Sequence, residues 1–272
     1  MRIASWNVEG RLSSTKATGR GVPLKIVDSI LLLDADVVFL AEAYKGMMDA
    51  TAQKRLTQFG YKIYEVSYDE QQRDLHSAVA THSVYISRVS YVAQKTIRLG
   101  DRSMPVVSVK ESTNGQILQL VGVHLDDRSE WQRLEQVEAL IRWIDVSVPV
   151  VLMGDFNAMH AAGISRVLAK PVVGMMMQRL PGVMGGIGRR VHEMAFGETM
   201  EVLVKGLLLH DADPRHRATA TPKMIGFEWL PSIRLLAIDH ILATAVLQMS
   251  DYRIAADGGS DHRAISVNIK LD

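Results

Sequence analysis

Short runs of apolar residues, many of them β-branched, recur along this chain, and a polar residue follows each run. The runs span residues 2–6, 37–40, 118–123, 148–153 and 235–238. The polar residues that follow them are Asn7, Glu42, His124, Asp155 and Asp239. Runs of this length and composition predict buried β-strands. Strands that share a sheet and end at one rim would gather these polar side chains there, so the pattern predicts a site as well as a fold.

Longer segments between the runs carry the helical repeat. Apolar residues recur at a spacing close to 3.6 over residues 24–33, and Pro23 suits the first turn of that helix. Residues 130–144 show the same spacing, and residues 191–209 are also expected to be helical. Residues 66–77 are polar and predict a loop. The alternation of strands and helices predicts an α/β protein.

The composition is that of an ordinary globular chain. Of 272 residues, 47% are hydrophobic and 22% charged, which excludes extended disorder. No convincing linker is found, so we expect one domain over residues 1–272, with a long insertion at about 158–234. The absence of cysteine excludes a disulfide framework and a cysteine nucleophile. With no secretory signal and no apolar run of roughly 18 residues, we expect a cytoplasmic monomer without a transmembrane segment.

Gly154-Asp155-Phe156-Asn157 is the most specific of the polar segments. The glycine permits a tight exit from the strand, while the Asp and Asn project acceptors and an amide donor into one small space. An Asx-rich turn is the alternative interpretation, as a surface carboxylate is for Glu42. Carboxylate oxygens suit Mg²⁺ or Mn²⁺, and phosphodiester hydrolysis needs such a cation together with an oriented water.

Two Asp-His pairs complete the series, Asp239-His240 and Asp261-His262. Carboxylates can hold a hard cation, and an imidazole can move a proton or bind a phosphate oxygen. If the strand continues through Asp239, His240 alternates to its other face. We therefore expect His240 to point away from the site.

Six sequence blocks, taken in order, resemble the endonuclease/exonuclease/phosphatase superfamily. They are Ser5-Trp6-Asn7-Val8-Glu9-Gly10, Ala35-Asp36-Val37-Val38-Phe39-Leu40-Ala41-Glu42, Gly122-Val123-His124-Leu125, Gly154-Asp155-Phe156-Asn157, Ile238-Asp239-His240-Ile241 and Ser260-Asp261-His262. The resemblance thus covers essentially the whole chain. It implies a four-layer α/β sandwich with two central mixed β-sheets flanked by helices. The chain departs from the family where residues 83–88 lack a glycine and where Ala41 replaces a common Gln, but neither change removes a proposed ligand.

The resemblance also implies a role for each polar residue. The metal ligands would be Glu42, Glu9, Asp261 and Asn7. The catalytic residues would be Asp155, Asn157, His124, Asp239 and His262. Asp155 would position or deprotonate the attacking water, and Asp239 would orient His262. Asn157 and His124 would contact the phosphate or the leaving oxygen.

The function implied is that of a metal-dependent hydrolase of phosphoester bonds, with Mg²⁺ or Mn²⁺ as cofactor. Nucleic acid is the expected partner, which makes the protein an endo- or exonuclease or a DNA-end phosphodiesterase. Arg88, Arg128 and Trp229 are candidate substrate-binding residues, with solvated surface charge as the alternative for the arginines. A phosphatase or phospholipase-like hydrolase of a small-molecule or lipid phosphoester stays open. A catalytically silent binding module is a third reading, against which the full set of ligands argues.

Overall fold

The computed structural model describes most of the chain. The described residues are 1–8, 24–44, 50–65, 81–99, 102–110, 115–160, 183–221, 234, 236–255, 258 and 260–271. Three sequence predictions lie outside them, namely the metal ligand Glu9, the substrate-binding Trp229 and the loop at 66–77. Within the described residues, no helix has the length and apolar content needed to cross a membrane.

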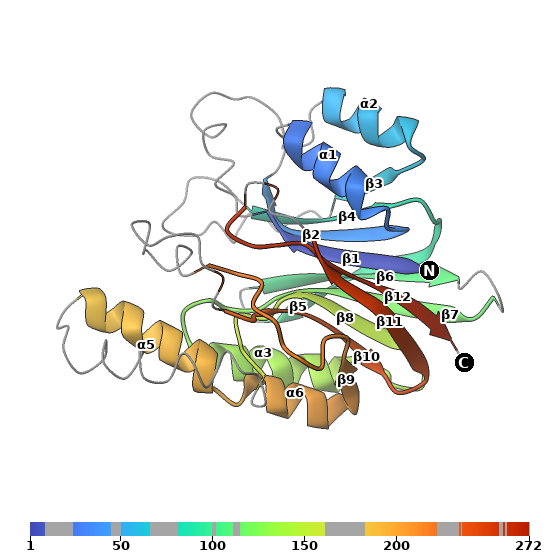
Figure 1. The fold of residues 1–272 in the computed structure, drawn as a ribbon. Coiled ribbons are helices and arrows are strands. Elements are labelled where there is room, and N and C mark those ends of the chain that lie inside the picture. The colour runs from blue at the N-terminus through green and yellow to red at the C-terminus, as the bar shows by residue number, and fades with distance from the viewer. Residues whose placement is uncertain are drawn as a thin grey trace.

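Two mixed sheets of six strands each form the centre of the fold (Figure 1). The strand order in the first sheet is β11 (Leu247–Ile254), β12 (Ile265–Leu271), β1 (Arg2–Asn7), β2 (Val37–Tyr44), β4 (Thr81–Ser87) and β3 (Lys62–Glu65). In this sheet β1 and β2 run parallel, and the other neighbouring strands run antiparallel.

The second sheet repeats this plan with one parallel pair at its middle. Its order is β5 (Tyr91–Leu99), β6 (Arg102–Lys110), β7 (Ile117–His124), β8 (Val150–Asp155), β10 (Asp239–Thr244) and β9 (Leu209–Asp211). Here β7 and β8 run parallel, whereas the remaining pairs are antiparallel.

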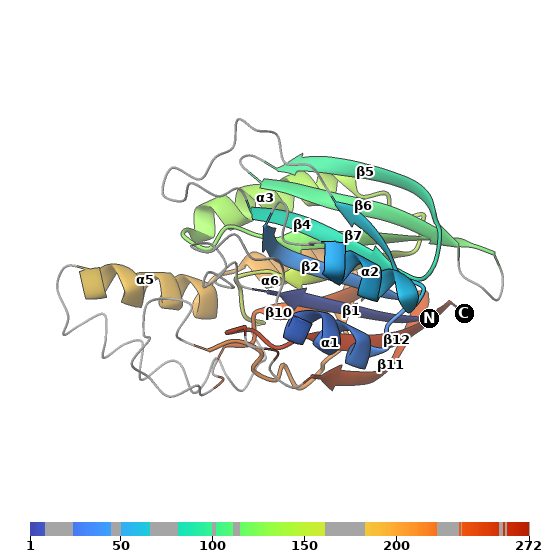
Figure 2. The ribbon, with the colours of Figure 1, turned by 90° about the horizontal axis from the view of Figure 1, so that it is seen from above.

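Helices cover the outer face of each sheet (Figures 1 and 2). The first sheet is covered by α1 (Leu24–Leu33) and α2 (Ala50–Gln58), and the second by α3 (Glu130–Trp143) and α6 (Thr199–Leu207). A further helix, α5 (Val183–Phe196), extends beyond the sheets near α6. The layers therefore run helix, sheet, sheet, helix, and the predicted four-layer α/β sandwich is confirmed. The predicted helix at 24–33 matches α1, and that at 130–144 matches α3 with Ile144 as its C-cap.

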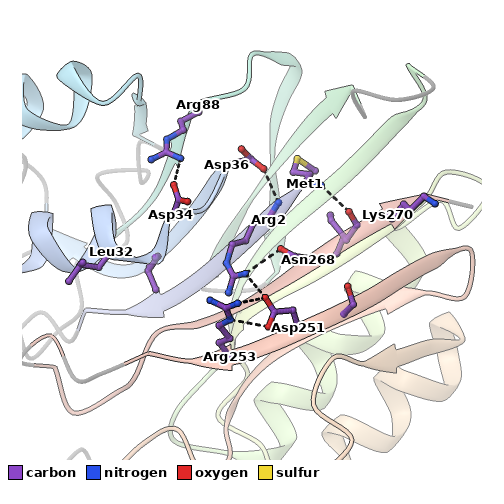
Figure 3. Close-up of a pocket in the computed structure, with 13 residues that line it drawn as sticks. Met1, Arg2, Leu32, Asp34, Asp36, Arg88, Asp251, Arg253, Asn268 and Lys270 are labelled. Carbon is purple, nitrogen blue, oxygen red and sulfur yellow. Dashed lines mark hydrogen bonds and ion pairs between the residues drawn. The ribbon is translucent and has the colours of Figure 1, made fainter.

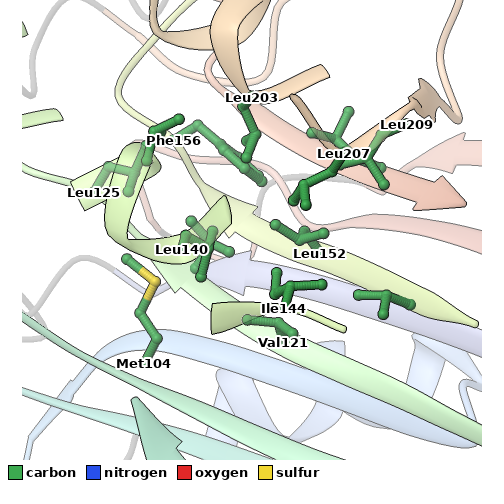
Figure 4. Close-up of a cluster of buried hydrophobic side chains, with 14 of the residues drawn as sticks. Met104, Val121, Leu125, Leu140, Ile144, Leu152, Phe156, Leu203, Leu207 and Leu209 are labelled. Atoms are coloured by element: carbon green, nitrogen blue, oxygen red, sulfur yellow. The ribbon is translucent and has the colours of Figure 1, made fainter. Parts of the chain in front are cut away.

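Apolar clusters fill the three spaces between the layers. Figure 4 shows the cluster between the second sheet and its helices, where Leu152 of β8 packs with Leu140 of α3 and Leu203 of α6. Between the sheets, Phe39 of β2 approaches β7 so closely that a Cβ on Gly122 would lie 2.2 Å from its ring. A glycine is needed at that position because the facing side chain occupies the space of any Cβ.

The strand pairings bring the predicted polar residues to one rim. In the first sheet Asn7 pairs with Ala41, one residue before Glu42. In the second sheet Asp155 lies between His124 on β7 and Asp239 on β10. Parallel neighbours end at the same edge of a sheet, and an antiparallel neighbour begins there. The ends of β1, β2, β7 and β8 therefore meet the start of β10.

The strand predicted at 235–238 is wrong. The strand instead begins at Asp239 and continues to Thr244, and before it Leu236 forms an isolated bridge with Ala220. Residues 236–238 are nonetheless buried, which accounts for their apolar composition. An apolar run indicates that a segment is buried, and a segment without regular structure can be buried as well as a strand can. Asp239 still reaches the rim, since β10 runs antiparallel to β8.

The single helix predicted at 191–209 is also wrong, because the chain breaks between α5 and α6 at Gly197. A Cβ at Gly197 would lie 2.2 Å from the Glu130 carboxylate of α3. That carboxylate accepts hydrogen bonds from the backbone N (2.8 Å) and Oγ1 (2.9 Å) of Thr199. It satisfies one free backbone amide at the start of α6, as a capping side chain does. The cap comes from a distant segment, so the local pattern could not show it.

Replacing Gly154 with alanine is expected to lower the free energy of unfolding by about 3 kcal/mol or more. A Cβ at Gly154 would lie 1.8 Å from the backbone carbonyl oxygen of Val123, which cannot move without breaking the pairing of β7 with β8. Urea unfolding measures the change. Gly115→Ala is the matched control, because its φ of 71° is also positive, so it carries backbone strain, while its Cβ meets nothing within 4 Å. Equal losses in the two variants would contradict the expectation.

Candidate active site

An amide from β1 joins two carboxylates that belong to different sheets. The Nδ2 of Asn7 donates to Oε1 of Glu42 at 3.0 Å and to Oδ2 of Asp155 at 2.9 Å. Asn7 and Asp155 are buried, whereas Glu42 is half-buried and can reach a ligand. Predicted residues from three separate blocks of the sequence are thus brought together at the rim.

The backbone of Glu42 is held in an unusual conformation. Its φ of 54° lies in the left-handed region, and the register between β2 and β4 shifts between Leu40 and Ala43. A bulge of this kind redirects a side chain. A residue other than glycine in such a conformation costs of order 1–3 kcal/mol, and strain of this kind clusters at functional sites.

A buried carboxylate–imidazole pair stands beside this group. The Nδ1 of His262 lies 2.9 Å from Oδ2 of Asp239 and 3.1 Å from Oδ1. The hydroxyl of Thr219 donates to Asp239 Oδ2 at 2.6 Å. On the other side of the ring, His262 Nε2 lies 3.8 Å from Asp155 Oδ2. Thr219 was not among the predicted site residues, because nothing in the local sequence distinguishes it from Thr221.

The Ser260-Asp261-His262 segment is fixed by bonds from the first sheet. The indole Nε1 of Trp6 donates to the His262 carbonyl at 3.1 Å, and Ser260 Oγ donates to the Asn7 carbonyl at 2.7 Å. Asp261 is buried, and its Oδ1 lies 3.8 Å from His262 Nε2. The structure therefore places Asp261 beside the cluster.

His124 connects the cluster to an arginine that the sequence analysis did not predict. Its Nε2 lies 3.4 Å from Oε1 of Glu42, and its Nδ1 lies 3.3 Å from Nη1 of Arg102. Since a guanidinium only donates, Nδ1 is the acceptor and the ring proton sits on Nε2. Burial, followed by the positive charges of Arg102 and His262, holds the pKa of His124 well below its usual value. No motif marks Arg102, which begins β6.

Asn157 orients Asp155 through a tight turn. Its backbone N donates to Asp155 Oδ1 at 2.9 Å, and its Nδ2 donates to the Leu125 carbonyl at 3.0 Å. Its φ of 49° is left-handed, a conformation that asparagine tolerates well. Its buried Oδ1 makes no hydrogen bond within the described residues. An amide oxygen at this position can accept a hydrogen bond from a water molecule, but it cannot donate one to a phosphate oxygen.

The charges of the cluster follow from burial and proximity. Burial raises the pKa of Asp155 to about 7; the positive His262 opposes this rise and Asp239 adds to it. Burial disfavours a charged His262, but the neighbouring carboxylates of Asp239 and Asp155 outweigh it and raise its pKa well above the ordinary value. The site therefore pairs a neutral imidazole at His124 with a positive one at His262.

The donor set fits a hard divalent cation. Ligand atoms of Glu42, His124 and Asp155 lie within 4.8 Å of one another, and so do those of Asp155, Asp239 and His262, although the positively charged ring of His262 cannot itself bind a metal ion. Carboxylate oxygens predominate in these groups, and such donors favour Mg²⁺ or Mn²⁺. These residues therefore form a candidate site for a divalent metal ion.

The structure does not bring Arg88 to this cluster. Its Nη1 bonds Oδ1 of Asp34 at 2.6 Å, and its guanidinium lies 4.4 Å from the centre of the Tyr61 ring. Its backbone N donates to the carbonyl of Asp36, at the start of β2. Glu42 lies six residues further along that strand, about 20 Å away at roughly 3.3 Å per residue. Substrate held at Glu42 is therefore out of reach of Arg88.

Arg88 lines a groove at the opposite end of the first sheet (Figure 3). The groove has a volume of about 850 Å³. Its charged side chains bond one another, as Asp251 does with Arg2 at 3.1 Å and with Arg253 at 2.6 Å. It contains no other predicted site residue, so we place the chemistry at the rim with Glu42.

Arg128 belongs to a group of arginines beside His124. Arg102, Arg128 and Arg190 surround Asp127, and we call these four residues the arginine rim. Arg102 Nη2 lies 3.3 Å and Arg128 Nε 4.0 Å from Asp127 Oδ1, and Arg190 bonds the other carboxylate oxygen. Three positive charges against one negative charge give the arginine rim a net charge of +2.

A sandwich of two sheets with carboxylates, amides and an Asp-His pair at one rim defines a class, that of metal-dependent phosphoester hydrolases. The chain belongs to the Endonuclease/Exonuclease/phosphatase family, whose sequence profile matches residues 4–262. The resemblance drawn from the sequence blocks is thereby confirmed. The protein is a phosphoesterase of this family.

Solved structures share the fold at low sequence identity. An endonuclease/exonuclease/phosphatase from Beutenbergia cavernae has 18% identity and a TM-score of 0.67 over 100% of this chain and 71% of that chain. A mannosyl-6-phosphatase from Bacteroides thetaiotaomicron has 15% identity and a TM-score of 0.63, with 100% of each chain covered. D. rerio TDP2, complexed with a single-stranded DNA product, has 17% identity and a TM-score of 0.60 over 100% of this chain and 99% of that chain. No curated protein matches the chain.

Proposed function

We propose that this protein is a Mg²⁺- or Mn²⁺-dependent phosphodiesterase that cleaves nucleic acid, as a nuclease or as an enzyme of DNA ends. The observation that carries this choice of substrate is the arginine rim beside His124. A nucleic acid presents phosphates on both sides of the bond that is cleaved, and a cationic surface next to the reacting phosphate binds them.

The cation would be held by Glu42, with Asp261 beside it, and Asp155 would face the attacking water. When bound, the cation neutralises charge on the reacting phosphate. Asn7 keeps the carboxylates of Glu42 and Asp155 at a fixed separation through its paired hydrogen bonds. The residues thus arrange their negative charge before substrate arrives, which is the condition for electrostatic stabilisation without reorganisation.

Asp155 would act on the attacking water. Its two oxygens are oriented by Asn7 and by the backbone of Asn157, so one carboxylate face is directed toward the cluster. As the water oxygen bonds to phosphorus and the ester P–O bond breaks, Asp155 takes the water proton. A carboxylate with its pKa raised to about 7 is well matched to a proton transfer near neutral pH.

The two imidazoles would bind the phosphate from different sides. His262, kept positive by Asp239, donates from Nε2 to the oxygen that gains negative charge. His124 is neutral and donates from Nε2, while Arg102 fixes its tautomer. The leaving oxygen receives a proton from His262 or from solvent.

A panel of substrates tests the proposal. Purified protein with Mg²⁺ or Mn²⁺ is assayed on plasmid DNA, single-stranded DNA, RNA, an abasic duplex, a sugar phosphate, an inositol phosphate and sphingomyelin. We expect cleavage of nucleic acid that EDTA and Glu42→Ala abolish, whereas Glu135→Ala, at an exposed position of α3, leaves it unchanged. Hydrolysis confined to small or lipid phosphoesters would overturn the choice of nucleic acid and support the phosphatase alternative.

Removing two arginines of the arginine rim tests whether this surface binds the phosphates of the substrate. Arg128→Ala combined with Arg190→Ala is expected to raise KM for DNA about tenfold at low salt, with kcat little changed. The slope of log(kcat/KM) against log salt concentration should fall by about 1–2, since each lost phosphate contact removes about 0.9. Arg142→Ala with Arg253→Ala removes equal charge from exposed sites elsewhere and is the control. An unchanged salt slope in the rim variant would contradict binding of phosphates there.

A further inference from the structure

A second group of ionisable side chains lies on the other face of β10. His240 follows Asp239 in the strand and points away from it, as the alternation of side chains predicts. It meets Asp211 at the end of β9 and His216 in the loop that follows. We call these three residues the histidine cluster. The catalytic roles proposed above use none of its members.

The cluster brings two imidazole nitrogens and a carboxylate oxygen together. Asp211 Oδ2 lies 2.8 Å from Nδ1 of His240 and 3.4 Å from Nδ1 of His216. One ligand atom from each of the three residues lies within 4.8 Å of the other two. Ligands of a tetrahedral zinc ion, at about 2.0–2.1 Å from the metal, are about 3.4 Å from one another. The observed spacing needs only small adjustments to admit such an ion.

The hydrogen bonds of His240 prepare it as a ligand. Its Nε2 lies 3.2 Å from the carbonyl of Ala158 and 3.1 Å from that of Ala237, so Nε2 carries a proton. Nδ1 then directs a lone pair at the carboxylate of Asp211, and two acceptors this close require a positive species between them. That species is a proton or a metal ion. Donation of the second ring nitrogen to a backbone carbonyl is the usual arrangement for a metal-bound histidine.

His216 is held in place with its Nδ1 buried. The side chain is 7% exposed, and Nδ1 makes no hydrogen bond within the described residues. Its φ of 46° is left-handed, and Asp213 fixes the loop by accepting from the backbone N of Arg217 at 2.8 Å and of Arg215 at 3.2 Å. The ring of His160 stacks on it at 4.2 Å. Asp211 Oδ2 lies 3.4 Å from this Nδ1 of His216, and a buried imidazole nitrogen with so weak a contact is better satisfied when an ion binds it.

We propose that the histidine cluster is a structural site for a divalent transition-metal ion, zinc being the ion that its donors suit best. Two imidazoles and one carboxylate select such an ion, whereas the carboxylate-rich rim selects magnesium or manganese. Binding forms bonds from Nδ1 of both histidines and Oδ2 of Asp211, and the proton between His240 and Asp211 leaves to solvent. The ion would tie β9, its following loop and β10 together.

Metal content and thermal stability test this site separately from the catalytic one. All variants carry Glu42→Ala, which weakens metal binding at the proposed catalytic site. The protein is stripped with EDTA, equilibrated with Zn²⁺ or Co²⁺ and dialysed, and bound metal is measured by mass spectrometry. Visible absorption of the Co²⁺ form reports nitrogen and oxygen coordination, and Tm is measured with and without Zn²⁺.

We expect about one equivalent of metal and a Zn²⁺-dependent rise in Tm of several degrees. His216→Ala and the isosteric Asp211→Asn should each lower metal affinity at least tenfold and remove the rise in Tm. His210→Ala, at the exposed position next to Asp211, should retain both. Circular dichroism shows whether each variant is folded. No retained metal in the parent, or equal retention after Asp211→Asn, overturns the proposal and leaves a protonated His240–Asp211 ion pair.

Discussion

Replacing Asp155 with asparagine is expected to lower kcat for phosphodiester hydrolysis by about 10²–10⁴-fold, the range for loss of a general base. The substitution preserves the shape of the side chain and removes the group that would accept the proton of water. Binding of DNA through the arginine rim is left intact, so the apparent affinity for DNA should change by less than about threefold. Single-turnover rates and equilibrium binding to a DNA duplex measure the two quantities.

The stability of the Asp155→Asn variant should move in the opposite direction. A buried carboxylate beside Asp239 is costly in the metal-free protein, and a neutral amide removes that cost. The Tm of the metal-free variant is therefore expected to equal or exceed that of the parent. Asp145→Asn, in the exposed turn after α3, is the matched control for activity. An Asp155→Asn enzyme with near-parental kcat would show that another group activates the water.

Replacing His262 with alanine is expected to lower kcat by about 10²–10³-fold, as removal of one charged donor to a developing oxyanion does. Asp239→Asn should cause a comparable loss, since Asp239 keeps His262 positive and fixes its ring. The two residues act as a unit, so the double variant should lose little more than the worse single variant. Steady-state kinetics of the four proteins provide this double-mutant cycle.

Asp251→Asn is the control for the carboxylate change, because Asp251 lies in the groove at the far end of the first sheet. Circular dichroism and Tm separate loss of catalysis from loss of folding. Fully additive losses in the cycle would show that Asp239 contributes to catalysis by a route other than His262.

The spacing of apolar residues along the sequence correctly predicted the elements that bury one face against a single neighbouring layer. The helix at 24–33 has one buried face, with Val27 and Ile30 against the first sheet, and the 3.6 spacing records it directly. The pattern failed at 235–238 and at Gly197. In the first case burial arises without strand pairing, and in the second a carboxylate from α3 terminates the helix.

The site could be predicted to the extent that its residues follow strand ends. Asn7, His124 and Asp155 each end a strand, so a sheet that aligns those ends also assembles the residues. Arg102 and Thr219 could not be found in this way. Their roles depend on contacts with His124 and Asp239 that arise only when separate segments of the chain pack side by side. A sequence pattern contains no record of such distances.

The close approach of Phe39 to Gly122 has a consequence for the alignment of the candidate site. Asn7, Glu42 and His262 move with the first sheet, and His124, Asp155 and Asp239 with the second. Phe39 lies three residues before Glu42, and Gly122 two before His124, so this contact helps to set the distance between the two halves of the candidate site. A side chain added there spreads the halves apart, and the chain can remain folded while its reacting groups lose alignment. Packing between the sheets, as well as the polar residues themselves, thus determines how the groups of the candidate site are aligned.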